Sequence, residues 1–206
     1  MIIAIDGTTA SGKGTLAREL ARHYGLARLD TGALYRAVAL AVLDKGGDVA
    51  DSATAEAAAR ALDLRAIDEY RIRSGAVGTA ASVVAGNQKV RAILFEAQRA
   101  FAAQPGGAVL DGRDIGTIIC PDATVKFFVD ASLEERTRRR HAELAARGEP
   151  VEIEALRAQI ADRDQRDITR RIAPLKQAPD AHLLDTTALS IEGAATAARR
   201  IIDAAR

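Results

Sequence analysis

The sequence predicts an α/β fold in which a five-stranded parallel sheet carries helices on both faces. Short β-branched runs alternate with helical patterns along the 206 residues, and a glycine-rich turn separates the first run from the first helix. Four of these runs are closed by aspartates, namely Asp6, Asp111, Asp130 and Asp185. Because ligands of parallel sheets bind beyond the carboxyl ends of the strands, we expect the functional site at that edge.

The first hundred residues predict two strands and five helices. Residues 1–6 form a β-branched run that stops at Gly7, and the apolar residues of 13–24 recur at helical spacing before Gly25, a C-capping residue. The same patterns predict the other elements of this half: a strand at 26–30 and helices at 31–45, 52–62, 76–85 and 88–103. Residues 63–74 are weakly patterned, and we expect an extended or hairpin-like insert there.

The second half predicts three strands and three helices. Ser132, followed three residues later by Glu135, predicts a capping box at a helix start. The predicted elements are strands at 108–110, 124–129 and 182–185, and helices at 132–146, 151–171 and 190–205. We expect the turn at 146–151 to be mobile.

The composition limits the classes of partner. Lys and Arg number 29 against 28 Asp and Glu, a net charge of +1, and the aromatic residues are 3 Tyr and 4 Phe without Trp. Neither the charge nor the stacking surface favours binding to nucleic acid. A single cysteine, Cys120, can form neither an intrachain disulfide nor a zinc site, and no apolar run is long enough for a membrane span or signal peptide. We therefore expect a cytoplasmic protein, acting as a monomer, whose partners are small molecules.

The strongest chemical signal lies between the first strand and the first helix. Its residues are Gly7, Thr8, Thr9, Ala10, Ser11, Gly12, Lys13, Gly14 and Thr15, which match the phosphate-loop pattern G-x-x-x-x-G-K. Glycines let successive N–H groups face an anion, the helix N-terminus adds positive charge, and the lysine reaches the outer phosphates. The motif predicts a fold of P-loop NTPase type that binds a nucleoside triphosphate with Mg²⁺. Because Gly14 stands where Ser or Thr is usual, Thr15 is the remaining hydroxyl for phosphate or metal.

Charged residues at other strand ends and on two helices predict a second anion site. Asp111, Arg113 and Asp114 follow a short apolar strand, so Asp111 is a candidate for the water shell of magnesium. Arg36 lies near the start of the helix that follows the second strand, which directs it toward a second anion close to the first. Two helical faces carry clustered charges that suit a phosphate clamp: Arg136, Arg139 and Arg140 on one, and Arg163, Arg166, Asp167 and Arg170 on the other. The alternative is that these side chains lie on solvated faces and form intrahelical ion pairs.

Four segments together resemble bacterial cytidylate kinases. They are Ile-Asp-Gly-x-x-x-Ser-Gly-Lys-Gly-Thr at 5–15, Leu-Asp-Thr-Gly-Ala-Leu-Tyr-Arg at 29–36, Asp-Gly-Arg-Asp-Ile-Gly-Thr at 111–117, and Arg-Asp-x-Arg-Asp-x-x-Arg at 163–170 with Ala-Pro-Leu at 173–175. The first segment fits many nucleoside monophosphate kinases, whereas the other three in this order are typical of the cytidylate branch. The resemblance covers nearly the whole chain.

The resemblance implies an enzyme that transfers the γ-phosphoryl group of ATP to CMP, and to dCMP. It implies ATP phosphates on residues 7–15, and an acceptor site that includes Thr31, Tyr35, Arg36, Ser82, Arg91, Arg113, Asp114, Arg163, Asp167 and Arg170. By the same comparison, the acceptor phosphate lies among Arg36, Arg113 and Arg170, and Ser82, Arg91 and Asp114 read the base. The groups implied for catalysis are Lys13, Arg113, Asp114, Arg139 and Arg163, with Thr15 as a metal ligand.

The resemblance also implies one kinase domain over residues 1–206, with an acceptor-binding insert at about 63–85 and a lid at about 140–170. Relatives carry a longer, strand-rich insert between Leu62 and Ser82, so this one is shortened. Two alternatives stay open on sequence alone. One is another small-substrate P-loop kinase acting on AMP, UMP or shikimate, and the other is a nucleotide-binding switch that does not transfer phosphate.

Overall fold

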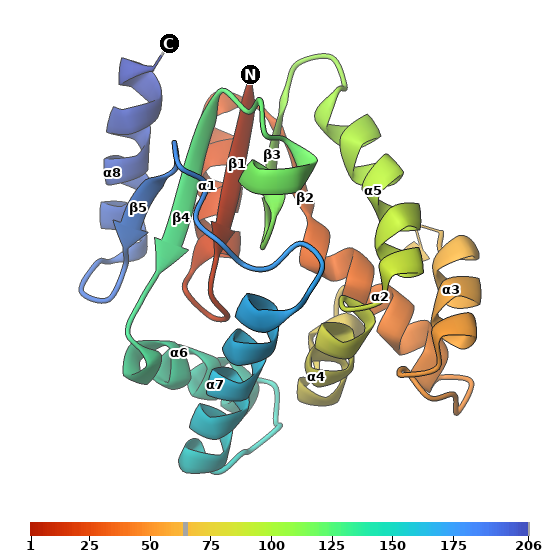
Figure 1. The fold of residues 1–206 in the computed structure, drawn as a ribbon. Helices are drawn as coiled ribbons and strands as arrows, with labels where there is room; N and C mark the ends of the chain where they lie inside the picture. The colour runs from red at the N-terminus through yellow and green to blue at the C-terminus, as the bar shows by residue number, and fades with distance from the viewer. Residues whose placement is uncertain (64–65, 206) are drawn as a thin grey trace.

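A computed structural model describes residues 1–63 and 66–205, and it confirms the predicted α/β fold. Five strands form one parallel sheet in the order β2-β3-β1-β4-β5 (Figure 1). Their bounds are β1 Ile2–Gly7, β2 Ala27–Asp30, β3 Ala108–Gly112, β4 Val125–Asp130 and β5 His182–Asp185. Because all five run the same way, the aspartates that close them lie along one edge of the sheet.

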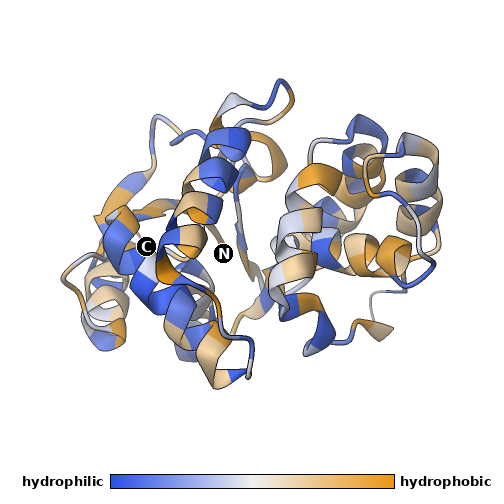
Figure 2. Cartoon of the chain, turned by 90° about the horizontal axis from the view of Figure 1, so that it is seen from below, coloured by the Kyte–Doolittle hydropathy of each residue, from blue (hydrophilic) through white to orange (hydrophobic). Residues whose placement is uncertain are grey.

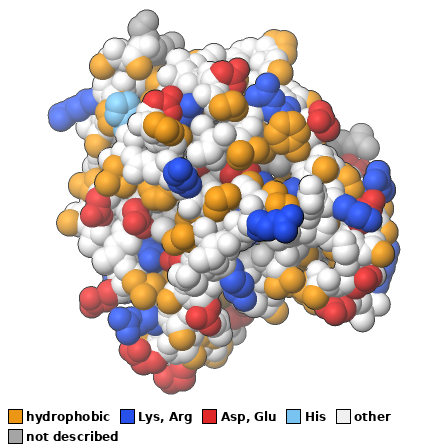
Figure 3. Space-filling model, viewed as in Figure 1, with side chains coloured by type: hydrophobic (Ala, Val, Ile, Leu, Met, Phe, Trp, Pro, Cys, Tyr) orange, Lys and Arg blue, Asp and Glu red, His pale blue; other side chains and the backbone are white. Residues whose placement is uncertain are grey.

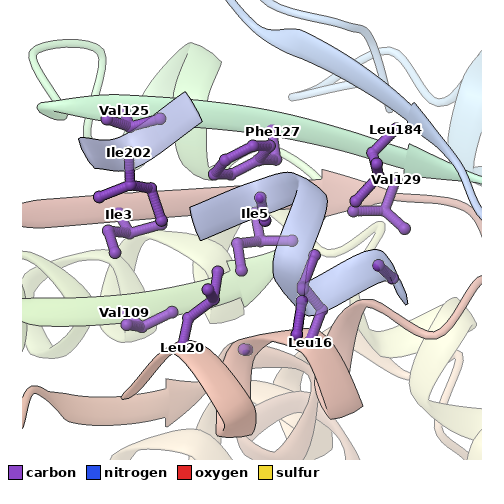
Figure 4. Close-up of a cluster of buried hydrophobic side chains, with 14 of the residues drawn as sticks. Ile3, Ile5, Leu16, Leu20, Val109, Val125, Phe127, Val129, Leu184 and Ile202 are labelled. Atoms are coloured by element: carbon purple, nitrogen blue, oxygen red, sulfur yellow. The ribbon is translucent and has the colours of Figure 1, made fainter. Parts of the chain in front are cut away.

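One face of the sheet packs against helices α1 (Lys13–Tyr24) and α8 (Ile191–Ala204). Alternate residues of β1 and β4 point into this layer, as the two-residue period of a strand requires. Figure 4 shows Ile3, Ile5 and Phe127 from the sheet meeting Leu16 and Leu20 of α1. Phe127 is 1% exposed, so this layer is closed to water and fixes the strand from which the glycine-rich loop departs.

The other face is covered by α5 (Gln88–Ala102) and by a short π-helical segment, Ile115–Ile119. Ala4 and Leu110 of the sheet contact Ile115 and Ile119 of that segment, and all four are buried. Asp6, 4% exposed, accepts the backbone N–H groups of Ile115 and Gly116 at 2.7 Å each. The end of β1 therefore holds the segment that follows Asp114.

A group of helices stands beside the sheet. Its members are α2 (Thr31–Leu43), α3 (Ser52–Arg60), α4 (Gly75–Val84) and the first half of α5. Leu34, Val38, Val84 and Leu94 are among the buried side chains that they share. Figure 2 shows hydrophobic and hydrophilic stretches alternating along the helices, as expected of helices with one buried side.

Two further helices lie beyond the carboxyl ends of the strands (Figure 1). They are α6 (Leu133–Ala146) and α7 (Ile153–Thr169), and Leu144, Leu156 and Ile160 form the small buried cluster between them. We call α6, α7 and the turn between them the lid. None of the helices in the described part of the chain combines the length and hydrophobicity that a membrane span needs.

The structure corrects two local predictions. Residues 63 and 66–74 contain no strand; they form turns and the 3-10 helix Arg71–Arg73, and residues 64–65 lie outside the described residues. Ile72, 0% exposed, packs with Ala33 and Ala37 of α2, and buried tertiary contacts of this kind hold a turn in place without a partner strand. The capping box is half formed. Ser132 Oγ accepts the N–H of Glu135, but the Ser132 N–H donates to Thr187 Oγ1 and Glu135 pairs with arginines.

Candidate active site

The glycine-rich loop leaves the sheet where β1 lies against β4. Gly7 has φ +154°, and a Cβ there would lie 1.9 Å from the carbonyl oxygen of Val129, so no larger residue fits. Gly12, at φ +89°, turns the chain into α1, which begins at Lys13. The chain thus places the free N–H groups of the helix start at the edge of the sheet, where an anion is favoured.

Some of the predicted loop residues support the loop through their side chains, and most of them line a cleft. Thr8 Oγ1 donates to Asp130 Oδ1 at 2.6 Å, and Ser11 Oγ donates to the Thr8 carbonyl at 3.0 Å, so both hydroxyls support the loop from within. Gly7 and Thr8 line neither of the two clefts described below. Residues from Thr9 to Thr15 line at least one of them.

Two clefts meet at Lys13. The smaller, about 210 Å³, lies between the sheet edge, α2, α4 and α7, and the larger, about 550 Å³, lies between the loop, α6 and the start of α8. Lys13 borders both, and its Nζ donates to the Thr8 carbonyl at 3.0 Å. Burial, and next the charge of Arg113, lower the pKa of Lys13. A bound anion would oppose this lowering by restoring the charged form.

Basic side chains from three different segments line the smaller cleft. Arg36 comes from α2, Arg113 from the end of β3, Arg163 from α7 and Arg170 from the end of α7. All four were predicted for the acceptor site, and the fold brings them together, although they lie as far apart as residues 36 and 170 in the sequence.

Three of these arginines have carboxylate partners. Arg36 Nη2 lies 2.8 Å from Asp30 Oδ2, Arg113 Nε lies 2.8 Å from Asp167 Oδ2, and Arg170 Nη2 lies 3.5 Å from Asp114 Oδ1. Burial opposes ionisation of Asp167, but the charges of Arg113 and Arg163 together lower its pKa below the ordinary value. These pairs orient the guanidinium groups before any ligand arrives.

Arg163 is different, because among the described residues it forms no hydrogen bond and no ion pair. Its Nε is buried without a partner, as is Arg36 Nε. Burial, and next the nearby charge of Arg113, lower the pKa of Arg163 to about 10. The carboxylate that acts on Arg163, Asp167, is already paired with Arg113. A buried guanidinium that is so little neutralised is unfavourable, so this position favours an anionic ligand.

The inner end of the smaller cleft carries the groups predicted to read a base. Arg91 and Asp114 form a buried ion pair there, and the guanidinium of Arg91 lies 5.6 Å from the centre of the Tyr35 ring. Ser82 Oγ donates to the Thr79 carbonyl at 2.9 Å, which leaves its lone pairs free toward the cleft. Thr31 also lines this cleft, and its hydroxyl donates to the Asp111 carbonyl.

Only some of the arginines predicted for the phosphate clamp line a cleft. Arg139 lines the larger cleft, held by Thr186 Oγ1 at 3.0 Å and the Thr186 carbonyl at 2.7 Å, and Arg140 borders both clefts. Arg136 lines neither, because Asp164 and two carbonyl oxygens occupy its donors. Arg166 is exposed and lies outside both clefts. Arg166 is thus solvated, as the alternative expected. Arg139 and Arg140 form the intrahelical ion pairs of that alternative, with Glu135 and Glu143, and still border a cleft.

A magnesium ion would meet few protein ligands. Within residues 1–63 and 66–205, no cluster of three or more acidic, histidine or cysteine side chains suits a metal. Asp111 Oδ1 accepts two hydrogen bonds from Arg28, at 2.8 and 3.1 Å, while its Oδ2 lies 3.5 Å from the position of a Cβ at Gly14. Thr15 lines the larger cleft. This donor set fits Mg²⁺, which is commonly held by one or two protein oxygens together with nucleotide phosphates and water.

Sequence reasoning missed three residues of the site. Asp30 closes β2, borders both clefts and pairs with Arg36; its place at a strand end was the available signal. Arg28, in the middle of β2, reaches Asp111, and Arg73 borders both clefts from the insert. Nothing in the local pattern around Arg28 or Arg73 marks them.

The turn between α6 and α7 contacts the segment that leads into α4. Glu149 Oε2 accepts the N–H of Gly75 at 3.0 Å, at the start of α4. The guanidinium of Arg147 lies 4.4 Å from the centre of the Tyr70 ring and donates to the Tyr70 carbonyl at 3.0 Å. These contacts join the α6–α7 turn to residues on either side of Arg73 and Ser74, which line the smaller cleft.

Comparisons with known proteins agree with this geometry. Residues 3–203 match the family model described as cytidylate kinase. A curated cytidylate kinase of Rhodopseudomonas palustris (strain TIE-1) is 58% identical over 206 residues, which cover 100% of this chain and 97% of the relative. One from Methylobacterium sp. (strain 4-46) is 62% identical over 181 residues, 88% of this chain and 86% of the relative. An uncharacterized protein from Eubacterium ventriosum has a similar fold, with TM-score 0.60 at 16% identity and 98% of each chain covered.

Proposed function

Since the chain belongs to the cytidylate kinase family over nearly its whole length, we propose that it transfers the γ-phosphoryl group of ATP to CMP, giving ADP and CDP. The observation that carries this proposal is the position of Lys13 between two clefts, one rimmed by the phosphate loop and the other by arginines that include Arg36, Arg113 and Arg163. A donor and an acceptor bound on either side of one ammonium group are arranged for direct transfer.

The larger cleft is proposed for ATP. Residues 7–15 supply the phosphate loop, in which Gly12, Lys13 and Thr15 stand at the start of α1 and Gly7 gives the backbone its entry angle. Arg139 points toward this cleft from α6, held by Thr186. Its charge and that of Lys13 would stabilise the oxygens of the transferred group.

The smaller cleft is proposed for CMP. Arg36, Arg113 and Arg170 would hold its phosphate, and Arg163 with Asp167 would lie beside the ribose and the transferred group. The unpartnered guanidinium of Arg163 supports a dianionic phosphate in its vicinity. Tyr35 and Thr31 would complete the wall of this cleft.

The pair formed by Arg91 and Asp114 supports cytosine as the base. Cytosine presents acceptors at N3 and O2, which suit a guanidinium, and an exocyclic amine, which suits a carboxylate. Uracil presents a donor at N3 and an acceptor at O4, so Asp114 would face another acceptor. An unmatched buried polar contact costs about 1–3 kcal/mol, enough to discriminate the two bases. Ser82 would provide a further hydrogen bond.

The reaction we propose is an in-line displacement without a covalent phosphoenzyme. The phosphate oxygen of CMP attacks the γ-phosphorus of ATP, and the bond to the β,γ-bridging oxygen breaks. The transition state is loose and anionic, so the chain's task is to align the two nucleotides and supply positive charge from Lys13, Arg113, Arg139 and Arg163. Asp114 acts by positioning the acceptor. Magnesium, held by the nucleotide with Thr15 and Asp111 nearby, would supply further positive charge at the phosphates.

Finer features are proposals of the same kind. We propose dCMP as a second acceptor and a cytoplasmic monomer as the working form. We also propose that residues 63–85 are the insert that closes over the acceptor, and that residues 140–170, which make up most of the lid defined above, close with it. The contacts of Glu149 and Arg147 with the insert support this division, since they join the two parts.

An ADP-release assay against a panel of CMP, dCMP, UMP and AMP tests the proposal. We expect turnover with CMP and dCMP, much weaker turnover with UMP and AMP, and little ATP hydrolysis when no acceptor is present. Preference for AMP or UMP would reassign the substrate, and ATP binding with no transfer to any acceptor would favour a nucleotide-binding switch.

A further inference from the structure

Both backbone groups of Thr9, in the phosphate loop, are bound by side chains of the lid. The N–H of Thr9 donates to Asp164 Oδ1 at 3.2 Å, and Arg136 Nη1 donates to the Thr9 carbonyl at 3.1 Å. Asp164 comes from α7 and Arg136 from α6, and the two side chains form an ion pair with each other. One peptide segment of the loop is therefore enclosed between two helices that lie more than a hundred residues further along the chain.

The ion pair is buried and stands apart from both clefts. Arg136 and Asp164 are each 7% exposed, and neither lines the larger cleft, proposed for ATP, or the smaller cleft, proposed for CMP. Arg136 Nε also donates to the Ala131 carbonyl at 2.9 Å, and this hydrogen bond fixes the orientation of the guanidinium group. Neither side chain is thus available to a nucleotide, and the established chemistry of the reaction gives them no task.

The loop at this point has an unfavourable backbone conformation. Ala10, the next residue after Thr9, has φ +61°, in the left-handed region that residues with a Cβ rarely adopt. Such a conformation persists only where the surroundings hold it. Ala10 itself borders both clefts, so its conformation decides how the loop faces the phosphates.

We propose that the Arg136–Asp164 pair is a positioning device that holds the Thr9–Ala10 segment in its nucleotide-binding shape and thereby couples the phosphate loop to the lid. The inference rests on the proposed function only in naming ATP as the ligand of the loop. Arg113 Nη2 donates to Thr9 Oγ1 at 3.0 Å, so the same residue is also tied to the acceptor side. Thr9 therefore joins the loop, the lid and the acceptor cleft.

The proposal predicts a specific pattern in a double-mutant cycle. Asp164→Asn keeps the size of the side chain but removes its charge and one of its two contacts. Losing a hydrogen bond to a charged group corresponds to about a tenfold loss in affinity or more, so we expect a rise of about tenfold or more in the ATP dissociation constant, measured by titration calorimetry. Arg136→Gln is expected to produce the same defect. Asp162→Asn, an exposed carboxylate two residues away on α7, is the matched control.

The second arm replaces Ala10 by glycine, which adopts a positive φ without strain. If the pair serves to hold Ala10 in that conformation, Asp164→Asn will cost at least threefold less ATP affinity in the Ala10→Gly background than in the wild-type background. A pair that only stabilises the fold would give equal losses in both backgrounds, and that result would overturn the proposal. So would unchanged ATP affinity in Asp164→Asn.

A rescue of folding provides a further readout, and the titration separates this proposal from the proposed function. If Asp164→Asn and Arg136→Gln do not fold by themselves, Ala10→Gly is expected to restore a cooperative thermal transition in each, and failure to do so contradicts the proposal. The calorimetric titration needs no acceptor nucleotide. An enzyme inactive toward CMP would therefore refute the proposed function while leaving this test intact.

Discussion

Replacing Arg163 by methionine should stabilise the nucleotide-free protein while impairing the reaction. The guanidinium of Arg163 lies in the smaller cleft among other arginines, and its Nε has no partner. Burial, and next the charge of Arg113, lower its pKa from the ordinary arginine value to about 10. Because the pKa in the folded state lies below that of the unfolded chain, the charged form destabilises the fold by its full amount at every pH below about 10. This cost then decreases as the pH rises from about 10 toward the pKa of the unfolded chain.

The magnitude follows from the same values. The fall of the Arg163 pKa to about 10 corresponds to about 3 kcal/mol of unfavourable free energy carried by the charged side chain near neutral pH. Methionine keeps the length of the side chain without the charge, so the free energy of unfolding should rise by about 1–3 kcal/mol once lost packing is allowed for. For a chain of this size, the melting temperature would rise by roughly 2–10 °C.

The kinetic effect should have the opposite sign. A cation that stabilises the transferred phosphoryl group typically contributes a factor of about 10² to 10³ in kcat, and we expect a loss of that order. Arg166→Met, one turn further along α7 and exposed, is the control that should change neither quantity appreciably. Thermal melts without nucleotide and steady-state assays with CMP measure the two effects. A variant that melts below the wild type, or that retains full turnover, would refute the reasoning.

Three other changes probe the rest of the site. Asp114→Asn should raise KM for CMP about tenfold or more and leave KM for ATP within twofold, because Asp114 pairs with Arg91 in the acceptor cleft alone; equal effects on both substrates would contradict its role with the base. Gly7→Ala should prevent a stable fold or lower the melting temperature by at least 10 °C, since its Cβ would lie 1.9 Å from a carbonyl oxygen, and circular dichroism melts measure this. Glu149→Gln weakens the contact with the Gly75 N–H, so ATP hydrolysis without acceptor should rise a few-fold; an unchanged rate would show that this contact does not exclude water.

The positions of the helices and strands along the chain followed from local signals. The β-branched run before Gly7, the helical spacing after Lys13 and the C-cap at Gly25 are all properties of a few neighbouring residues, and the structure has each element within a few residues of its predicted bounds. The weakly patterned residues 66–74 were predicted as an extended or hairpin-like insert and form turns and a 3-10 helix instead, because a tertiary contact of Ile72 decides their shape.

The balance of charge over the surface also agrees with the composition. Figure 3 shows basic and acidic side chains interspersed over the visible face, as a net charge of +1 implies. Composition therefore limits the general character of the surface. It does not say which cations face a ligand, because that depends on the carboxylates that the fold places beside each of them.

Arg136 and Arg163 show where the sequence stopped being sufficient. Both stand on charged helices at helical spacing from other arginines, and the pattern assigned both to one phosphate clamp. In the structure, Arg136 is buried against Asp164 and the phosphate loop, whereas Arg163 opens into the acceptor cleft without a partner. By itself, the sequence determined the strands, the helices and the phosphate loop, since short-range periodicity and glycine chemistry encode them. Only the tertiary structure decided the strand order and the partner of each arginine, because a buried charge takes its counter-charge from segments that are remote along the chain.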